Sequence, residues 1–188
     1  MRPRLKKSLT LTELLISVCI LSIIAIGFTS IEIFSRYHVI NADRRIKTQN
    51  DASFVLRHMT NEITRAIGSA SQSPISVTTI EEDPAVIIWI DYNENGMRDS
   101  APTDRQIAYR YRGDPDYEFR YYSDYSGSPS SYEVISKKAY GFTRSSTDNY
   151  LEVELQFCYS PSLTGCGVHD NPIQEIKTRI YMPSVSTN

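Results

Sequence analysis

The first part of the chain carries a long apolar segment that leads into a helical repeat. Four basic residues come first, namely Arg2, Arg4, Lys6 and Lys7. Glu13 follows, and Leu14 to Ile31 then gives 18 residues without a charge. A helix of that length spans about 27 Å, which is close to the hydrocarbon thickness of a bilayer. The pattern predicts that residues 9–31 cross a membrane as a helix.

The apolar segment continues into an amphipathic one at residues 32–73. Its apolar side chains recur every four residues and form one stripe. They are Val55, Met59, Ile63 and Ile67. No proline interrupts this part, and Gly68 is expected to end the helix. The pattern predicts one helix from about Leu9 to Ile67, and the alternative is two helices broken near Gly27 or Asn41.

After residue 73 the apolar pattern changes from a period of four to a period of two. Alternating apolar and polar side chains predict half-buried antiparallel strands. These strands are expected at residues 75–80, 85–90, 105–112, 117–121, 151–157 and 175–180. One face of their sheet needs a cover, which the apolar stripe of the helix can supply. The expected fold class is α+β, with a long N-terminal helix packed on an antiparallel sheet in a head domain at residues 74–188.

The charge and the motifs of the chain argue against two classes of function, namely nucleic-acid binding and catalysis. Removing residues 1–8, which hold four basic residues, would change the formal charge from −2 to −6. A domain that acidic is a poor general binder of nucleic acid, so no nucleic-acid partner is expected. No nucleophile motif, phosphate-binding loop or paired-cysteine zinc pattern occurs, and His38, His58 and His169 follow no metal-ligand spacing. We therefore expect no enzyme, no catalytic residue and no organic cofactor.

Glu13 is the residue that a plain membrane segment does not explain. A charge within such a segment costs about 2.5–3.5 kcal/mol on insertion scales, so it usually has a partner. A secretory signal peptide has a shorter apolar core and a small-residue cleavage site, and no clear site occurs here. A plain signal-anchor accounts for the length of the segment but gives no reason for Glu13. In an anchored chain, the basic cluster predicts a cytoplasmic N-terminus and a head outside.

The residues around Glu13 resemble the cleavage motif of type IV prepilins. The segment reads Lys6-Lys7-Ser8-Leu9-Thr10-Leu11-Thr12-Glu13-Leu14-Leu15. It has a short basic leader, a small residue, an apolar residue, and Glu as the fifth residue after the junction. The family usually has Gly where this chain has Ser8, and Phe where it has Leu9. The resemblance implies a leader peptide at residues 1–8, cleavage by prepilin peptidase between Ser8 and Leu9, and N-methylation of Leu9.

The same resemblance supplies a partner for Glu13. Cleavage after Ser8 would create an amine at Leu9, which lies four residues from Glu13 and on the same face of a helix. A paired carboxylate is much less costly in a low-dielectric layer than an unpaired one. In pilin-like filaments this Glu is thought to meet the N-terminal amine of a neighbouring subunit, so Glu13 is the expected assembly residue. The alternative is a Glu13 that reaches the membrane surface without a partner.

Two further stretches resemble minor pilins and minor pseudopilins of the PilW/GspJ type. They are residues 51–68, DASFVLRHMTNEITRAIG, and residues 89–112, WIDYNENGMRDSAPTDRQIAYRYR. The resemblance implies a pilin-like fold in an inner-membrane subunit that assembles into, primes or caps a type IV pilus. The alternative within that class is a minor pseudopilin of a type II secretion system. The expected partners are prepilin peptidase, other pilin or pseudopilin subunits and the inner-membrane assembly platform.

A loop rich in oxygen ligands is a candidate calcium site. Its residues match the first nine positions of a calcium-loop pattern, namely Asp91, Asn93, Asn95, Gly96 and Asp99. The twelfth position holds Pro102 in place of Glu, and Asp104 could substitute for it. A strand is expected before the loop instead of the helix of an EF-hand, and Asn-Gly and Asp also favour an ordinary turn. Both interpretations stay open, and calcium binding would suit a signal-anchored periplasmic binding domain that never polymerises.

Two of the three cysteines are candidates for a disulfide. Cys158 and Cys166 enclose seven residues, with Pro161 and Gly165 to turn the chain. In an exported domain they are expected to form a bond that gains roughly 2.5 kcal/mol in the chain-entropy description. In a cytosolic protein they would be free thiols. Cys19, inside the apolar segment, is expected to be a packing residue.

Tyrosines interleave with small turn residues at residues 121–132. This composition suits a recognition surface, but we expect a solvated loop whose tyrosines pack on the sheet. Arginines also lie among tyrosines, as in proteins that bind single-stranded nucleic acid. They are Arg105, Arg110, Arg112 and Arg120. Because we expect them on polar strand faces with acidic neighbours, nucleic-acid binding is not favoured.

Overall fold

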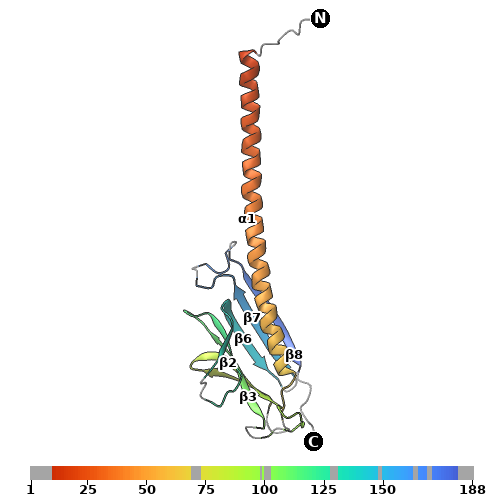
Figure 1. Cartoon of the computed structure of the whole chain (residues 1–188). Helices are drawn as coiled ribbons and strands as arrows, with labels where there is room; N and C mark the ends of the chain where they lie inside the picture. The colour runs from red at the N-terminus through yellow and green to blue at the C-terminus, as the bar shows by residue number, and fades with distance from the viewer. Residues whose placement is uncertain are drawn as a thin grey trace. The chain divides into compact units, whose positions relative to one another are not determined.

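The computed structural model of the chain describes residues 10–68, 73–97, 99, 103–127, 131–147, 150–162, 165–168 and 171–181. The predicted leader, the Ser8–Leu9 junction, Pro102 and His169 lie outside the described residues. Within them the chain forms one helix, α1 (Leu11–Ile63), and eight strands in two antiparallel sheets (Figure 1). The chain divides into two compact units between Asp43 and Arg44, and α1 contributes residues to both. The predicted α+β class is confirmed.

The helix α1 has no break at either of the two positions considered, but it ends earlier than predicted. Its last residue is Ile63, not Ile67. Beyond this end, the amide of Ile67 donates to the carbonyl of Trp89 at 2.9 Å, and the amide of Asp91 donates to the carbonyl of Arg65 at 3.3 Å. These backbone groups pair with the chain at the end of a strand, so they are not available for helical hydrogen bonds. The helix therefore ends before Gly68, because its following backbone groups bond to the chain around Trp89 and Asp91.

The strands form two sheets, where one was predicted. The first sheet consists of β1 (Ile75–Ile80), β2 (Asp83–Ile90), β3 (Arg105–Arg112), β4 (Glu118–Tyr122) and β5 (Glu133–Ser136). The second consists of β6 (Ala139–Ser146), β7 (Tyr150–Cys158) and β8 (Ile173–Tyr181). Strands that are neighbours in a sheet are also consecutive in the chain. The strands predicted at residues 75–80 and 105–112 are confirmed with the same bounds.

Two strands, β5 and β6, lie in a part of the chain for which the sequence predicted no element. In β6 the buried apolar side chains are Ala139 and Phe142, three residues apart. The register between β6 and β7 shifts between Ala139 and Gly141. Such an irregularity breaks the period of two that identifies a strand. A search for strict alternation therefore misses β6.

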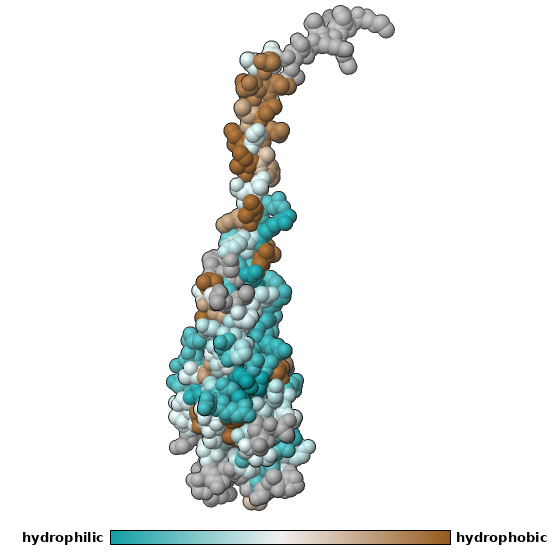
Figure 2. All heavy atoms as spheres, turned by 90° about the vertical axis from the view of Figure 1, so that its left-hand side faces the viewer, coloured by the Kyte–Doolittle hydropathy of each residue, from teal (hydrophilic) through white to brown (hydrophobic). Residues whose placement is uncertain are grey.

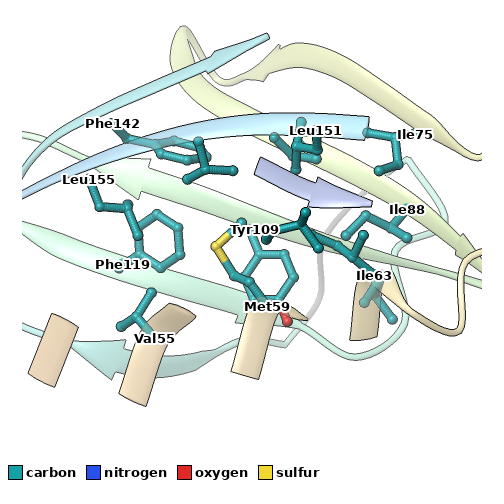
Figure 3. Close-up of a cluster of buried hydrophobic side chains, with 14 of the residues drawn as sticks. Val55, Met59, Ile63, Ile75, Ile88, Tyr109, Phe119, Phe142, Leu151 and Leu155 are labelled. Atoms are coloured by element: carbon teal, nitrogen blue, oxygen red, sulfur yellow. The ribbon is translucent and has the colours of Figure 1, made fainter. Parts of the chain in front are cut away.

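One hydrophobic core joins the C-terminal part of α1 to both sheets. The helix supplies side chains that are 0% exposed, namely Ala52, Val55, Met59 and Ile63. In Figure 3, Val55 and Met59 point toward Phe119 of the first sheet, and Leu155 of the second sheet lies beside the same ring. The predicted cover of the sheet by the helical stripe is therefore confirmed, with the difference that two sheets share it.

Arg144 of β6 links the two sheets. Its Nε donates to the carbonyl of Ala85 in β2 at 3.2 Å, and its Nη2 donates to the carbonyl of Thr78 in β1. These hydrogen bonds tie β6 to the first two strands of the first sheet. Burial lowers the pKa of Arg144 from its ordinary value.

Candidate functional site

The N-terminal end of α1 is closed by reciprocal hydrogen bonds between Thr10 and Glu13. Glu13 Oε2 accepts from the backbone N–H of Thr10 at 3.0 Å and from its hydroxyl at 2.9 Å. The amide of Glu13 points back at Thr10 Oγ1, at 3.4 Å. This arrangement is a capping box, which satisfies amide groups that have no partner within the helix. A carboxylate in the first turn also interacts favourably with the helix dipole.

The sequence-based prediction missed Thr10, although the signal was present. A Thr at residue 10 with a Glu three residues later is the pattern of a capping box. The prediction assigned the carboxylate of Glu13 to the amine of Leu9 instead. Leu9 lies outside the described residues, so that pairing stays a prediction. Within the described part of the chain, Thr10 is the group that holds the Glu13 carboxylate.

Beyond Glu13, the helix is apolar on every side. The large apolar side chains between Leu14 and Ile31 are 49% to 70% exposed. Figure 2 shows them as a nearly continuous brown surface on the N-terminal part of α1. Soluble monomers rarely expose contiguous apolar surface of this extent. By length and composition, α1 is long and apolar enough to cross a membrane.

Hydroxyl groups within this apolar segment are satisfied by the helix itself. Each donates to the carbonyl four residues earlier, at 2.7 to 2.9 Å, and they belong to Ser17, Ser22, Thr29 and Ser30. A hydroxyl bonded in this way does not need water, which makes its transfer into hydrocarbon less costly. The ion pair between Glu32 and Arg36, at 2.6 Å, marks the end of the uncharged run.

The C-terminal part of α1 is fixed on the first sheet by His58 and Tyr109. His58 Nδ1 lies 2.7 Å from Tyr109 Oη, and the Tyr109 side chain is fully buried. Burial raises the pKa of Tyr109 well above its ordinary value, and the Glu62 carboxylate raises it further. The phenol is therefore protonated at neutral pH, and its hydroxyl also donates to the backbone carbonyl of His58 at 3.4 Å. This contact sets the position of the helix on β3.

The oxygen-rich loop after β2 is closed by its own hydrogen bonds. Asp91 accepts from the amides of Asn95 and Gly96 at 3.2 and 2.8 Å. Asp99 accepts from the side-chain amides of Asn93 and Asn95 at 3.3 and 2.7 Å. The loop is thus held by carboxylates that point inward, which is how Asp and Asn stabilise turns.

Asp104 completes this loop from its far end. Its carboxylate is fully buried and accepts from the amides of Tyr92 and Asp99 at 3.2 and 2.6 Å. The structure therefore brings all five predicted ligand residues together. Within the described ranges, no group of three or more His, Cys, Asp or Glu side chains is placed to hold a metal ion. The hydrogen bonds explain the loop as a turn, and calcium binding stays a prediction.

Cys158 and Cys166 form the predicted disulfide, with their Cα atoms 6.1 Å apart. Asn171 stabilises the same loop, because its side chain accepts from the amide of Ser160 at 3.1 Å and donates to the carbonyl of Ser160 at 3.0 Å. The chain between β7 and β8 is therefore tied by one covalent bond and by hydrogen bonds from one amide. Cys19, in the apolar part of α1, is an exposed free thiol.

The outer face of the first sheet carries arginines that are buried, although the sequence predicted them on a solvent-facing polar face. Arg110 is 2% exposed and pairs with Glu81 at 2.8 Å and Asp83 at 2.6 Å. Arg120 is 6% exposed and lies 4.3 Å from the ring centre of Tyr132. Burial alone would lower the pKa of Arg110, but the hydrogen bonds to Asp83 and Glu81 raise it above its ordinary value. These cations are neutralised within the sheet.

The tyrosine-rich stretch covers this face in part. Tyr122 is buried, and its ring centre lies 5.7 Å from that of Tyr132 and 6.3 Å from that of Tyr125. The expected packing of tyrosines on the sheet is confirmed for these described residues. Their rings shield the neighbouring arginines from water, which explains why the alternation of the strands did not reveal the burial.

Comparison with known proteins yields no relative for this chain. It matches no protein family, no curated protein and no solved structure. The prepilin-like resemblance is confined to short stretches, so any function must be inferred from the residues described above.

Proposed function

We propose that the chain is a type IV pilin-like structural subunit, a minor pilin or minor pseudopilin. The observation that carries the proposal is the position of Glu13. It lies in the first turn of a helix whose next 18 residues are uncharged and whose large side chains are exposed. The capping box with Thr10 explains a carboxylate at the start of any such helix. What favours a pilin-like subunit is the spacing of Glu13, which is the fifth residue after a Ser8–Leu9 junction that resembles the prepilin motif, because a subunit that docks against the amine of a neighbour needs a carboxylate at this place.

In the proposed topology the N-terminus is cytoplasmic, the apolar part of α1 is in the inner membrane, and the head is outside. The basic residues before the segment support this orientation. The disulfide between Cys158 and Cys166 supports an exported head, because disulfides persist in oxidising compartments. The combination of an apolar helix with an antiparallel head agrees with the pilin-like architecture that the resemblance implies.

Leader cleavage would change the partner of Glu13. Before cleavage, its carboxylate is held by the N–H and the hydroxyl of Thr10. Cutting between Ser8 and Leu9 would add a cationic amine one residue before Thr10. A charge-assisted hydrogen bond is about twice as strong as a neutral one, so an ammonium group competes well for this carboxylate. In the assembled filament the amine of a neighbouring subunit would take that place and set the register.

The deciding experiment is to express the full chain with a prepilin peptidase and to determine its N-terminus by mass spectrometry. The expected product begins at a methylated Leu9. An intact Met1, or a cut after residue 30, would contradict the proposal and would favour a signal-anchored domain or a secreted one. As a second test, Glu13→Ala should be processed and folded but should fail to enter filaments. Normal incorporation of that variant would show that the carboxylate is not needed for assembly.

A complementation test separates a pilus subunit from a secretion subunit. The chain would be expressed in strains that lack the minor pilins and in strains that lack the minor pseudopilins, each with its own peptidase. Restored pilus formation would assign the first role, and restored protein secretion would assign the second.

A further inference from the structure

Two tyrosines from separate segments present parallel rings on the surface of the head. Tyr117 ends the loop between β3 and β4, and Tyr140 lies in β6. Their ring centres are 6.4 Å apart, and the angle between the ring planes is 10°. Tyr140 is 38% exposed, and Tyr117 is half-buried. The hydroxyl of Tyr111 donates to the carbonyl of Tyr140 at 2.7 Å, which holds β6 beside the loop. Tyr117 and Tyr140, called the tyrosine pair below, are therefore fixed in position and in contact with solvent.

The loop holds Tyr117 in a backbone conformation that an aromatic residue rarely adopts. Its φ is 53°, and at positive φ a bulky side chain crowds the backbone. The amides of Asp116 and Tyr117 both donate to the carbonyl of Gly113, at 3.0 and 2.9 Å, and close the loop. Glycine at residue 117 would make the same hydrogen bond without the strain. Strained residues of this kind occur at sites that clamp ligands, so the Tyr117 ring is a candidate ligand contact.

The tyrosine pair lies beside a carboxylate. Asp114 is exposed, and partial burial, the charge of Asp114 and a hydrogen bond to its carboxylate raise the pKa of Tyr117. Arg112, the basic residue that precedes the loop, pairs with Asp116 at 2.7 Å. Asp114 forms no ion pair with any residue that the structure describes. The charge next to the tyrosine pair is therefore negative and is not balanced within the described part of the chain.

Other tyrosine rings of the head lie against cations of the same chain. The distance from the guanidinium carbon to the ring centre is 4.5 Å for Arg105 and Tyr92, 4.3 Å for Arg120 and Tyr132, and 5.3 Å for Arg179 and Tyr150. A cation within about 6 Å of a ring centre is attracted by the negative face of the ring. Across the described ranges, no lysine or arginine lies over Tyr117 or Tyr140. The tyrosine pair thus has the aromatic faces and the carboxylate of a cation site, without a cation from its own chain.

We propose that the tyrosine pair and Asp114 bind a quaternary ammonium group such as that of free choline. Ring centres that are 6.4 Å apart allow one cation to lie within about 6 Å of both, and Asp114 adds the attraction of a full negative charge. A quaternary ammonium suits this surface better than a primary one, because a compact ammonium is strongly hydrated and loses more when it leaves water. The inference concerns the head alone and does not depend on the proposed role in a filament.

Ligand-observed NMR tests this binding on the full chain. Saturation transfer from the protein to the methyl groups of choline would be measured in maltoside micelles, which contain no choline. Choline should give a saturable signal, and its neutral analogue, in which a carbon atom replaces the nitrogen, should bind roughly tenfold more weakly. Equal affinity for the two compounds would overturn the proposal, since the surface would then recognise an apolar shape and not a charge.

Substitutions in the tyrosine pair and in Asp114 locate the site. Tyr140→Leu and Asp114→Asn should each weaken choline binding roughly tenfold. Tyr117→Gly should lose the saturable signal while its melting temperature stays the same or rises, because glycine takes this φ without strain. Choline binding that is unchanged in folded Tyr117→Gly or Tyr140→Leu would refute the site.

A second exposed tyrosine pair provides the matched control. The ring centre of Tyr181 lies 5.9 Å from that of Tyr150, over which Arg179 already lies. Tyr181→Leu should therefore bind choline like the parent chain. An equal loss of binding in Tyr181→Leu and Tyr140→Leu would show non-specific contact with exposed tyrosines and would count against the proposal.

Glycerophosphocholine separates a free cation from the headgroup of a choline lipid. It carries the same ammonium group next to a phosphate, which the carboxylate of Asp114 repels. It should therefore bind more weakly than choline, and Asp114→Asn should reduce the difference. Tighter binding of glycerophosphocholine would overturn the assignment to a free cation and would assign the ammonium group to a lipid headgroup.

Discussion

The carboxylate of Glu13 and the backbone of Thr10 form one closed unit at the start of α1. Glu13 Oε2 lies 3.0 Å from the amide nitrogen and 2.9 Å from the hydroxyl of Thr10. A residue that sequence reasoning could explain only through a neighbouring molecule therefore has a partner within its own chain. The capping box lowers the cost of placing this carboxylate next to an apolar segment, because its charge accepts hydrogen bonds there.

Removing the hydroxyl of Thr10 should loosen the first turn of α1. Thr10→Val is expected to cost about 1 kcal/mol of local helix stability, the usual effect of losing an N-cap side chain. Thr10→Ser keeps the hydroxyl and should behave like the parent chain. Hydrogen exchange of residues 11–16, measured by mass spectrometry on the full chain in nanodiscs, should be faster in the Val variant alone. Equal exchange in the two variants would refute the cap.

The hydrogen bond between His58 and Tyr109 should contribute measurably to the stability of the head. Tyr109→Phe removes the hydroxyl that lies 2.7 Å from His58 Nδ1 and should lower the free energy of unfolding by about 1 kcal/mol. Tyr121→Phe is the matched control, since this ring lies 4.7 Å from the His58 ring but its hydroxyl makes no hydrogen bond among the described residues. Urea unfolding followed by near-UV circular dichroism would measure both. Equal losses would mean that ring packing, not the hydrogen bond, explains the effect.

The turn between β1 and β2 should be improved by glycine at one position only. Ile80 pairs with Asp83 across a two-residue turn in which Glu81 and Glu82 have φ of 49° and 71°. Glycine, asparagine and aspartate are the residues usually found there, since other side chains crowd the backbone at positive φ. Glu82→Gly should therefore raise the free energy of unfolding by about 0.5–1 kcal/mol.

The neighbouring substitution tests whether a tertiary contact keeps Glu81 in this turn. Glu81→Gly relieves the same backbone crowding but removes the carboxylate that lies 2.8 Å from the buried Arg110. We expect its melting temperature to fall below that of Glu82→Gly. If the two variants melted together, the ion pair would add nothing to the stability of the turn.

Acid should weaken the Glu81–Arg110 contact in a defined direction. The hydrogen bond from Arg110, and then its positive charge, lower the pKa of Glu81 below its ordinary value of 4.5. A carboxyl whose pKa is lower in the folded state stabilises the fold above pH 4.5, and this contribution disappears as the pH falls through the folded pKa. The parent chain should therefore be more stable than Glu81→Gln at neutral pH, and the gap should close in acid. Thermal melts from pH 7 to pH 3 would show this, and a gap independent of pH would contradict it.

Local spacing along the chain was sufficient to identify most elements. The recurrence of Val55, Met59 and Ile63 at four-residue intervals predicted the helical stripe that covers the core. Alternation predicted β3 and placed β7 and β8 closely, because each strand buries one face. The two cysteines predicted their bond, since a short loop with a proline and a glycine brings them together.

Alternation failed where a neighbour changed the environment of a side chain. Arg110 alternates like a surface residue, yet it is buried because Glu81 and Asp83 neutralise it from the adjacent hairpin. Phe142 breaks the alternation of β6 because the register shifts at the preceding residues. A window of ten residues reveals neither the burial of Arg110 nor the shifted register of β6. The first depends on carboxylates that lie almost thirty residues earlier in the chain, and the second depends on how β6 pairs with β7.

The sequence by itself determined that the first part of α1 is apolar on every side, that Glu13 precedes it, and that the head alternates as strands. These properties depend only on which residues occupy successive positions. Tertiary structure decided that α1 ends at Ile63, that the strands divide into two sheets, and that β7 is the one described strand that pairs with β8. Those outcomes depend on which backbone groups find partners, and backbone donors and acceptors are the same at nearly every residue. Their pairing is therefore settled by packing between distant segments.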